Sequence, residues 1–188
     1  MDRRTAYSRM VIKDAFLKLL ASTPYSQIKV TQICQEADIS RSTFYLHFKK
    51  INDVLDDVLE EAYANVLHCV DHLLILRGFS EIQYQKEPLC QFIRKNKKYH
   101  SLFLDEELSN YVIGRYAKLH KDDYVAKLIS MTDLSEQEAN TVFWFYAHGC
   151  FSVTIHNLNK DDEDWAVLRH ALEQVMGRGL FGERWTEL

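Results

Sequence analysis

The chain has few of the residues that interrupt helices. Its 188 residues include only 6 glycines and 2 prolines, so little of the chain is loop or linker material. No segment has the composition of a disordered region, and there are no internal repeats. Good helix formers are abundant instead. The sequence therefore predicts an all-α fold with about nine helices, in a chain long enough for one or two domains and a substantial core.

Long apolar runs and paired cysteines are also missing. No run approaches the roughly 18 residues that a membrane-spanning helix needs, and the chain does not open on a cationic, apolar signal sequence. The four cysteines (Cys34, Cys69, Cys90 and Cys150) are scattered, with no CxxC pair. Cys34 and Cys150 lie in apolar helical patterns, so we expect small buried side chains in a reducing compartment. These observations favour a cytoplasmic protein that does not contact a membrane.

Common enzyme signatures are absent from the sequence. There is no Gly-rich phosphate loop, nucleophile elbow or paired metal motif. His68 and His72 are four residues apart on a predicted helix, a spacing that could place two imidazoles on one face for a metal. Such a pair is more often a partly exposed structural feature. The sequence therefore predicts no catalytic residue, no metal site and no cofactor.

The most informative segment is Lys29–Lys50, KVTQICQEADISRSTFYLHFKK, which is typical of two short helices joined by a tight turn. Ile33, Cys34 and Ala37 supply an apolar stripe at helical spacing. Asp38 falls at the turn, where the backbone needs a left-handed residue, and Asp tolerates that conformation better than most residues. The segment therefore has the pattern of a helix-turn-helix.

The second of these helices has a clear beginning and two different faces. Ser40 is suited to be its N-cap, because the hydroxyl can accept a hydrogen bond from a free N–H of the first turn. Ile39 and Phe44 can form a hydrophobic staple, and Phe44 and Phe48 are expected to be buried. The outward face then carries cationic, hydroxyl and aromatic groups: Arg41, Ser42, Thr43, Tyr45 and His47. A helix-turn-helix reads DNA with such a face.

These residues resemble the tetracycline-repressor (TetR) family of transcription regulators. The string STFYLHF at Ser42–Phe48, followed by two lysines and a long predicted helix, carries the resemblance, which covers roughly the first third of the chain. The sequence departs from the family at Asp38, where Gly is usual, at Lys29, where Thr or Ser is usual, and at Ile51, where Lys is usual. Ile51 removes a common phosphate contact, whose charge the two preceding lysines could replace.

The resemblance implies a homodimeric regulator, a repressor in its commonest form, that binds a near-palindromic operator in double-stranded DNA. It implies a DNA-binding head at residues 1–50, with the start of the next helix, and a dimerisation and effector domain at 51–188. Base contacts are expected from the start of the second helix and phosphate contacts from its end. The expected DNA-binding residues are Thr31, Arg41, Ser42, Thr43, Tyr45, His47, Lys49 and Lys50.

The charge distribution agrees with a nucleic-acid-binding head. Residues 1–50 hold nine basic and four acidic residues, a balance of +5, whereas the rest of the chain carries −9, so the net charge of −4 conceals a basic end. A basic head on an acidic body concentrates attraction for phosphate where the reading helix lies. Without the motif, an ordinary charged surface would explain the asymmetry equally well.

The remaining pattern is a series of helices. The first is expected to end before Pro24, and a long amphipathic helix from Val54 to near Gly78 would span about 35 Å. Further helices are expected at Leu89–Lys95, at Lys97–Phe103 and from about Glu106 to Ile129.

The last two helices, at about 135–157 and 163–177, are unusually apolar. Ser135 begins a capping box with Glu138, and Gly149 indicates a close approach by another backbone. We expect a four-helix interface with a second copy, although packing inside the monomer would also explain the pattern. The expected interface residues are Trp144, Phe151, Trp165, Leu168, Leu172 and Val175.

Two kinds of regulation remain open. In the TetR family an effector lies inside the C-terminal domain, and an aromatic set could line such a space for a small, mostly apolar effector. The candidates are Tyr63, Phe103, Tyr111, Tyr116 and Phe143, each of which could equally be ordinary core. Alternatively, the C-terminal domain binds a partner protein, because the segment FIRKNKKYHSLF resembles the family members grouped with dihydroxyacetone-kinase regulators.

Overall fold

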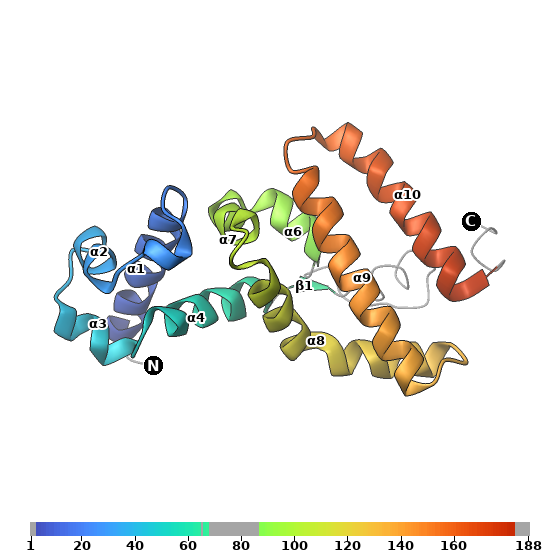
Figure 1. Ribbon diagram of the computed structural model, residues 1–188, viewed down its shortest axis with the longest axis horizontal. Helices are drawn as coiled ribbons and strands as arrows, with labels where there is room; N and C mark the ends of the chain where they lie inside the picture. Colours follow the sequence, from blue (N-terminus) through green and yellow to red (C-terminus); the bar gives the residue numbers. More distant parts are fainter. Residues whose placement is uncertain (1–2, 65, 68–86, 183–188) are drawn as a thin grey trace. The chain divides into compact units, whose positions relative to one another are not determined.

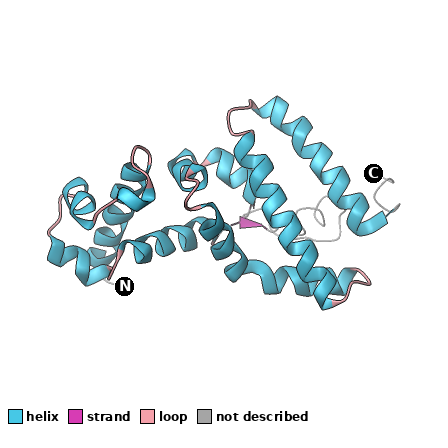
Figure 2. Cartoon of the chain, viewed as in Figure 1, coloured by secondary structure: helices cyan, strands magenta, loops and turns pink. Residues whose placement is uncertain are grey.

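The computed structural model describes residues 3–64, 66–67 and 87–182 and confirms the all-α fold (Figures 1 and 2). Within these ranges the chain forms nine α-helices and two short 3-10 helices. Extended pairing is limited, in the same ranges, to two residues on each of two parallel strands, β1 (Val66–Leu67) and β2 (Glu87–Pro88), with Val66 opposite Glu87.

The helices follow the expected order along the chain. They are α1 (Arg3–Leu20), η1 (Tyr25–Gln27), α2 (Val30–Glu36), α3 (Arg41–His47), α4 (Ile51–Tyr63), α6 (Leu89–Lys95), η2 (Lys97–Tyr99), α7 (His100–Leu104), α8 (Ser109–Met131), α9 (Glu136–His156) and α10 (Asp162–Phe181). The first helix ends before Pro24 as predicted, and the helix expected at Lys97–Phe103 is divided into η2 and α7.

The chain divides into two compact units. One consists of Met1–Asn65 and Lys95–Tyr116, and the other of Val66–Arg94 and Ala117–Leu188. The first unit therefore holds the predicted DNA-binding head (the reading head, residues 1–50) together with α4, η2, α7 and the beginning of α8. The predicted functional boundary after residue 50 lies within this unit and stays a prediction.

The core of the first unit fixes the helix-turn-helix from inside. Phe16 of α1, Ile33 of α2 and Phe44 of α3 are fully buried, as are Val54 and Leu55 of α4. Truncating one of these large side chains to Ala would cost about 2–5 kcal/mol. Because Phe44 holds the inner face of α3 in this core, the opposite face of α3 is turned to the surface.

The helix after the reading head is shorter than its sequence pattern indicates. It ends at Tyr63, not near Gly78, so α4 is about 20 Å long. Val66 is buried and pairs with Glu87 as part of β1. Its β-branched side chain is well suited to extended backbone, and this tertiary pairing outweighs the helical periodicity. Residues 68–78 of the predicted helix, and with them His68, Cys69 and His72, lie outside the described residues.

The second unit contains α9 and α10, which pack side by side (Figure 1). Ser135 is the N-cap of α9, and its main-chain N–H donates to the Glu138 carboxylate at 2.8 Å, so the predicted capping box is confirmed. Between the helices, Met176 packs against Tyr146 and Cys150. The backbone approach expected at Gly149 is not found within the described chain, where a Cβ at this position would meet nothing within 4 Å.

Other expected features concern single residues. Cys34 is buried and Cys150 half-buried, and neither forms a disulfide. Burial raises the pKa of the Cys34 thiol, which agrees with the expected small apolar role. None of the described helices is long and apolar enough to cross a membrane. Over the same residues, no group of three or more His, Cys, Asp or Glu side chains is placed to hold a metal ion.

Candidate nucleic-acid interface

The turn between α2 and α3 has the geometry predicted from the sequence. Asp38 has a φ of 51° and is the one non-glycine residue of the described chain with a positive φ. On either side of it, the N–H of Ala37 donates to the carbonyl of Ile33 at 2.9 Å, and the N–H of Ile39 donates to that of Cys34 at 3.0 Å. A left-handed residue ends α2 and redirects the chain into α3.

Ser40 caps α3 and gathers three hydroxyl groups at its beginning. Its Oγ accepts the N–H of Thr43 at 3.0 Å and lies 2.7 Å from the Ser42 Oγ and 2.9 Å from the Thr43 Oγ1. The predicted N-cap is therefore confirmed. Because hydroxyl groups can both donate and accept, this cluster can exchange its internal bonds for bonds to phosphate oxygens or base edges.

The predicted DNA-binding residues are accessible on the first unit. Six are exposed and two, Thr43 and His47, are half-buried; the exposed ones are Thr31, Arg41, Ser42, Tyr45, Lys49 and Lys50. Leu46 was missed by the sequence analysis and is 81% exposed. The sequence could have indicated this exposure. Leu46 falls outside the i, i+4 stripe made by Phe44 and Phe48, and it lies between two of the predicted contact residues, Tyr45 and His47.

The segment that follows α3 is held by the first turn of α4. One carboxylate oxygen of Asp53 accepts the main-chain N–H groups of Lys49 at 2.9 Å and Lys50 at 3.1 Å. An acidic residue at this point also suits the positive end of the helix dipole. The backbone of both lysines is thereby fixed while their side chains stay exposed. The sequence could have indicated this contact as well, because Asp53 lies three residues after Lys50.

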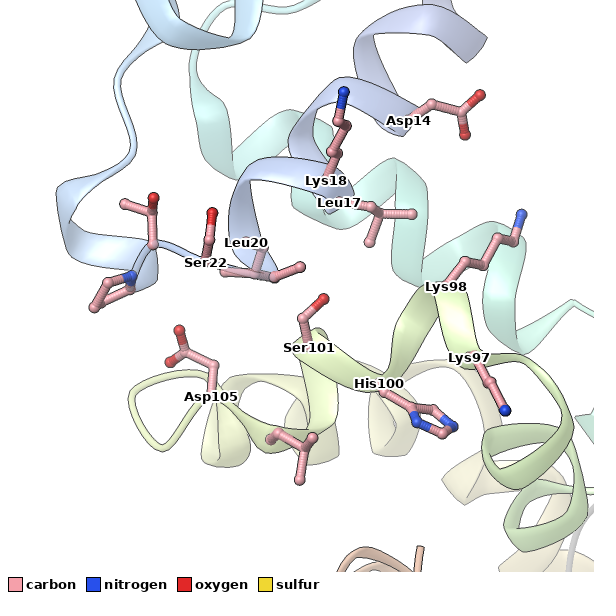
Figure 3. A pocket seen from close by; sticks show the side chains of 14 residues that line it. Asp14, Leu17, Lys18, Leu20, Ser22, Lys97, Lys98, His100, Ser101 and Asp105 are labelled. Atoms are coloured by element: carbon pink, nitrogen blue, oxygen red, sulfur yellow. The ribbon is translucent and has the colours of Figure 1, made fainter. Parts of the chain in front are cut away.

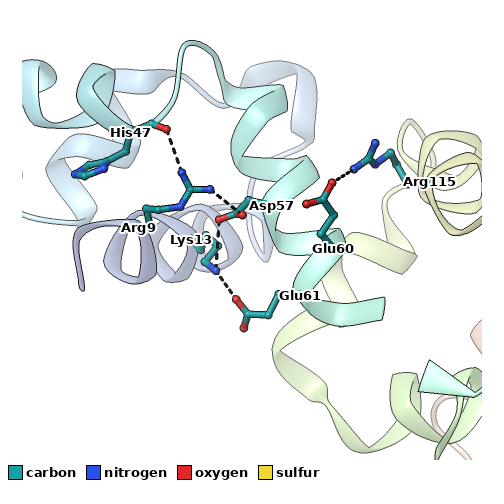
Figure 4. Close-up of polar contacts among 7 residues, drawn as sticks. All are labelled: Arg9, Lys13, His47, Asp57, Glu60, Glu61 and Arg115. Carbon is teal, nitrogen blue, oxygen red and sulfur yellow. Dashed lines mark hydrogen bonds and ion pairs between the residues drawn. The ribbon is translucent and has the colours of Figure 1, made fainter. Parts of the chain in front are cut away.

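An arginine of α1 holds the other end of α3 (Figure 4). The Arg9 Nη1 donates to the carbonyl of His47 at 3.3 Å, and the guanidinium carbon lies 4.5 Å from the ring centroid of Phe48. The Nη2 atom lies 2.8 Å from a carboxylate oxygen of Asp57 on α4. A cation at the C-terminal carbonyls of a helix is favourable, so Arg9 ties α3 to both α1 and α4.

Further ion pairs join α1 to α4. Lys13 of α1 lies 3.5 Å from Asp57 and also pairs with Glu61 (Figure 4). Burial alone would lower the pKa of Lys13, but the hydrogen bond to Glu61 and the nearby carboxylate charges raise it above its usual value. The same hydrogen bond lowers the pKa of Glu61. Glu61 also accepts from the Tyr99 hydroxyl at 3.3 Å and lies 3.7 Å from the Lys98 ammonium.

The neighbouring carboxylates of α4 bind α8. Arg115 lies 3.0 Å from Asp56 and 2.5 Å from Glu60. The Tyr111 hydroxyl donates to Asp56 at 2.6 Å, and burial, with this bond, raises the pKa of Tyr111 to about 12. Within the first unit, α4 therefore connects the helices of the reading head to η2 and α8 through polar contacts.

Four of the five aromatic residues proposed for an effector space are parts of the two cores, and Tyr111 is half-buried. Tyr63, Phe103 and Tyr116 are buried in the first unit, and Phe143 is buried in the second. The Tyr63 hydroxyl donates to the Val112 carbonyl at 3.2 Å. Neither of the two cavities beside α1 described below is lined by these residues or by Tyr111. Their burial favours the alternative that they are ordinary core residues.

The proposed interface residues of α9 and α10 differ in exposure. Phe151 and Trp165 are each 2% exposed within a single chain, and the Arg94 guanidinium carbon lies 4.8 Å from the centroid of the Trp165 ring. Their helical stripes therefore face the core of the second unit, and a place for either residue in a dimer interface stays a prediction. Leu168 and Leu172 are half-buried.

Trp144 and Val175 do reach the surface, with exposed fractions of 40% and 69%. Two larger exposures were missed, Phe145 on α9 at 72% and Val167 on α10 at 70%. The two helices thus carry four exposed apolar side chains between them.

Comparisons with known proteins agree with a helix-turn-helix regulator. The chain is 32% identical over 132 residues to the dhaKLM operon transcriptional activator DhaS of Lactococcus lactis subsp. lactis (strain IL1403), a match that covers 65% of this chain and 68% of that protein. It is 29% identical over 87 residues to the uncharacterized HTH-type transcriptional regulator YxbF of Bacillus subtilis (strain 168), covering 46% of this chain and 22% of that protein. No family model matches the chain.

Proposed function

Because this chain belongs to the family of helix-turn-helix transcriptional regulators, we propose that it is a TetR-type regulator that places α3 in the major groove of double-stranded DNA. The observation that carries the proposal is the division of α3 into two faces. Phe44 is fully buried, whereas Arg41, Ser42 and Tyr45 are exposed beside a capped helix start. The N-terminal residues of such a helix are the ones that reach base edges.

Each accessible side chain has a role in this proposal. Arg41, Ser42 and Thr43 contact base edges, with Thr31 of α2 beside them, because they lie at the start of the reading helix. Leu46 offers an apolar contact to a thymine methyl group or a sugar. Contacts to phosphate come from the end of α3 and the segment after it: Tyr45, His47, Lys49 and Lys50.

We also propose that the regulator is a homodimer. The support is the exposed apolar surface of α9 and α10, to which Phe145, Val167 and Val175 contribute. A two-fold dimer presents two reading helices to successive major grooves, roughly 34–36 Å apart or a multiple of that distance. The operator is therefore expected to be near-palindromic.

Two forms of regulation follow from this architecture. In the first, the protein is a repressor that a small, mostly apolar effector releases from the operator. In the second, the C-terminal part recognises a partner protein. Two observations favour the second form. Most of the aromatic residues proposed for an effector space are buried, and the relative DhaS is named a transcriptional activator, not a repressor. Calorimetric titration of metabolites beside a pull-down with the intact chain would separate the two forms.

Selection from a random duplex library tests the DNA-binding proposal directly. Wild-type protein should enrich two inverted half-sites whose centres are about 10 base pairs, or a multiple of that, apart. Arg41→Ala should relax the preference at one base position in each half-site and leave the spacing unchanged, because spacing is set by the dimer. Enrichment of one unpaired half-site would exclude the two-fold arrangement, and no enrichment would exclude sequence-specific binding.

A further inference from the structure

A cavity of about 730 Å³ lies within the first unit, between the end of α1 and the segment formed by η2 and α7 (Figure 3). One wall comes from Asp14–Leu20 and the turn that continues to Pro24. The opposite wall comes from residues 97–105. Its volume falls in the range of small-molecule sites, about 300–1,000 Å³. The eight proposed DNA-binding residues take no part in lining it.

The cavity joins an apolar floor to a polar rim. Leu17 and Leu20 are buried at the floor, and Leu104 is half-exposed at its edge. Hydroxyl groups of Ser22 and Ser101 stand on opposite walls (Figure 3). This combination suits a ligand with an apolar body and one polar end.

Three lysines of the lining, Lys18, Lys97 and Lys98, outnumber its two carboxylates, Asp14 and Asp105, so the charges of the rim favour an anionic end. Asp105 is already engaged, because its Oδ2 accepts the Tyr25 N–H at 3.0 Å and its Oδ1 accepts the Glu107 N–H at 2.9 Å. Lys98 pairs with Glu61. Lys97 is exposed and has no carboxylate partner among the described residues. Lys97 is therefore the cation best placed to receive a new negative charge.

We propose that this cavity binds a small organic anion, a carboxylate or a phosphate carried on an apolar body. The anionic group pairs with Lys97 and accepts hydrogen bonds from the hydroxyls of the rim, while the body covers Leu17, Leu20 and Leu104. This site is separate from the aromatic residues proposed above for an effector.

The position of the cavity links it to α1. A smaller cavity of about 180 Å³ shares Asp14, Leu17 and Lys98 with it and reaches Lys13 and Glu61. An occupant would thus contact the same helix whose Arg9 holds the end of α3. A ligand that binds one position of α1 more tightly than another would change the affinity for the operator. This effect on DNA binding, unlike the ligand binding itself, rests on the proposed DNA-binding function.

Calorimetry on the full chain without DNA tests the site. The probes are phenylbutyrate and phenyl phosphate, which separate the two anionic groups, and phenylbutanol as a neutral match. Saturable binding of one or both anions is expected, with phenylbutanol weaker. Lys97→Ala should weaken anion binding about two- to fivefold, as expected for an exposed ion pair. Lys95→Ala, an exposed lysine outside the cavity, should leave it unchanged.

A second variant tests the location. Ser101→Trp should fill the cavity and abolish saturable binding, with circular dichroism as the check on folding. If that variant does not fold, the comparison of Lys97→Ala with Lys95→Ala decides. No saturable anion binding, equal binding of phenylbutanol, or equal effects of the two lysine variants would overturn the proposal.

The DNA consequence has its own readout. Operator affinity measured by fluorescence anisotropy should change in the presence of the bound anion, and the anion's affinity should change by the same factor when operator is present. If the anion binds but does not change operator affinity, the binding site is supported and its regulatory role is contradicted. Failure to bind any operator, with anion binding intact, would contradict the proposed function instead.

Discussion

Arg9 of α1 and Asp57 of α4 form an ion pair with a separation of 2.8 Å, and the same guanidinium donates to the His47 carbonyl at the end of α3. One side chain therefore orients three helices of the first unit. Arg9 and His47 are 38 residues apart in the sequence, so the orientation of the reading helix depends on a contact that no local pattern specifies.

Arg9→Ala should lower the free energy of unfolding by about 1–2 kcal/mol, because a charge-assisted hydrogen bond and a partly exposed ion pair are lost together. Urea denaturation measures the change. Lys18→Ala is the control: Lys18 pairs with Glu36 but its side chain is 74% exposed, so its loss should cost at most about 0.5 kcal/mol. Equal effects of the two variants would show that the Arg9 contacts do not stabilise the head.

Ser40→Ala should destabilise the protein by about 1 kcal/mol, since the Thr43 N–H then loses its acceptor at the start of α3. Ser40→Gly should cost only a few tenths of a kcal/mol. Thermal unfolding of both variants, with Ser42→Ala as an exposed neighbour that is not the cap, measures the difference. An equally large loss for Ser42→Ala would assign the effect to the hydroxyl cluster instead of to capping.

Lys50→Ala and Arg41→Ala should weaken DNA binding in different ways. Loss of a phosphate contact at Lys50 should weaken binding to all duplexes and reduce the salt slope by about one unit. Loss of a base contact at Arg41 should cost about 1–3 kcal/mol on the operator and little on random DNA. Anisotropy titrations over a series of salt concentrations measure both. Equal losses for Arg41→Ala on operator and random DNA would remove its base-reading role.

The Lys13–Glu61 pair should give a defined pH dependence of stability. The pKa of Glu61 is lowered from 4.5, so its contribution is present above that value and is lost as the pH falls through the lower, folded-state pKa. The pKa of Lys13 is raised from 10.5, so its contribution is present below that value and is lost as the pH rises through the folded-state pKa.

A double-mutant cycle with Lys13→Met and Glu61→Gln, followed by urea denaturation at several pH values, measures this coupling. The coupling free energy should be constant near neutral pH and decline at both extremes. A coupling that does not decline as the pH falls through the lowered folded-state pKa of Glu61 would contradict an ionised pair.

Phe145→Glu should give a folded monomer, because Phe145 is exposed in the single chain and a charge there would be buried only in the dimer. Phe151→Glu should instead unfold the second unit, since Phe151 is already buried in it. Analytical ultracentrifugation and circular dichroism distinguish these outcomes. A fully dimeric Phe145→Glu protein would place the interface elsewhere.

Local patterns were sufficient for much of the reading head. The left-handed Asp38, the Ser40 cap and the buried Phe44 depend on residues within a few positions of one another, as does the capping box at Ser135 in the second unit. The end of α4 could not be predicted in the same way. An amphipathic pattern continues past Tyr63, but the pairing of Val66 with Glu87 brings together residues distant in sequence.

The interface residues show the same difference. An apolar stripe indicates that a helix face is covered, yet it does not say whether the cover comes from the same chain. The structure buries Phe151 and Trp165 in the second unit and leaves Phe145 and Val175 exposed. Only the packing of α9 against α10 decides which of these side chains are buried, because the exposure of a side chain depends on every element around it.

By itself, then, the sequence determined the helical class, the helix-turn-helix and its caps, since these follow from backbone preferences and hydrogen bonds between near neighbours. Only the tertiary structure decided where α4 ends, that Arg9 joins α3 to Asp57, and that a cavity lies between α1 and α7. Each of these depends on side chains brought together from distant parts of the chain, and a contact of that kind leaves no periodic signal in either segment.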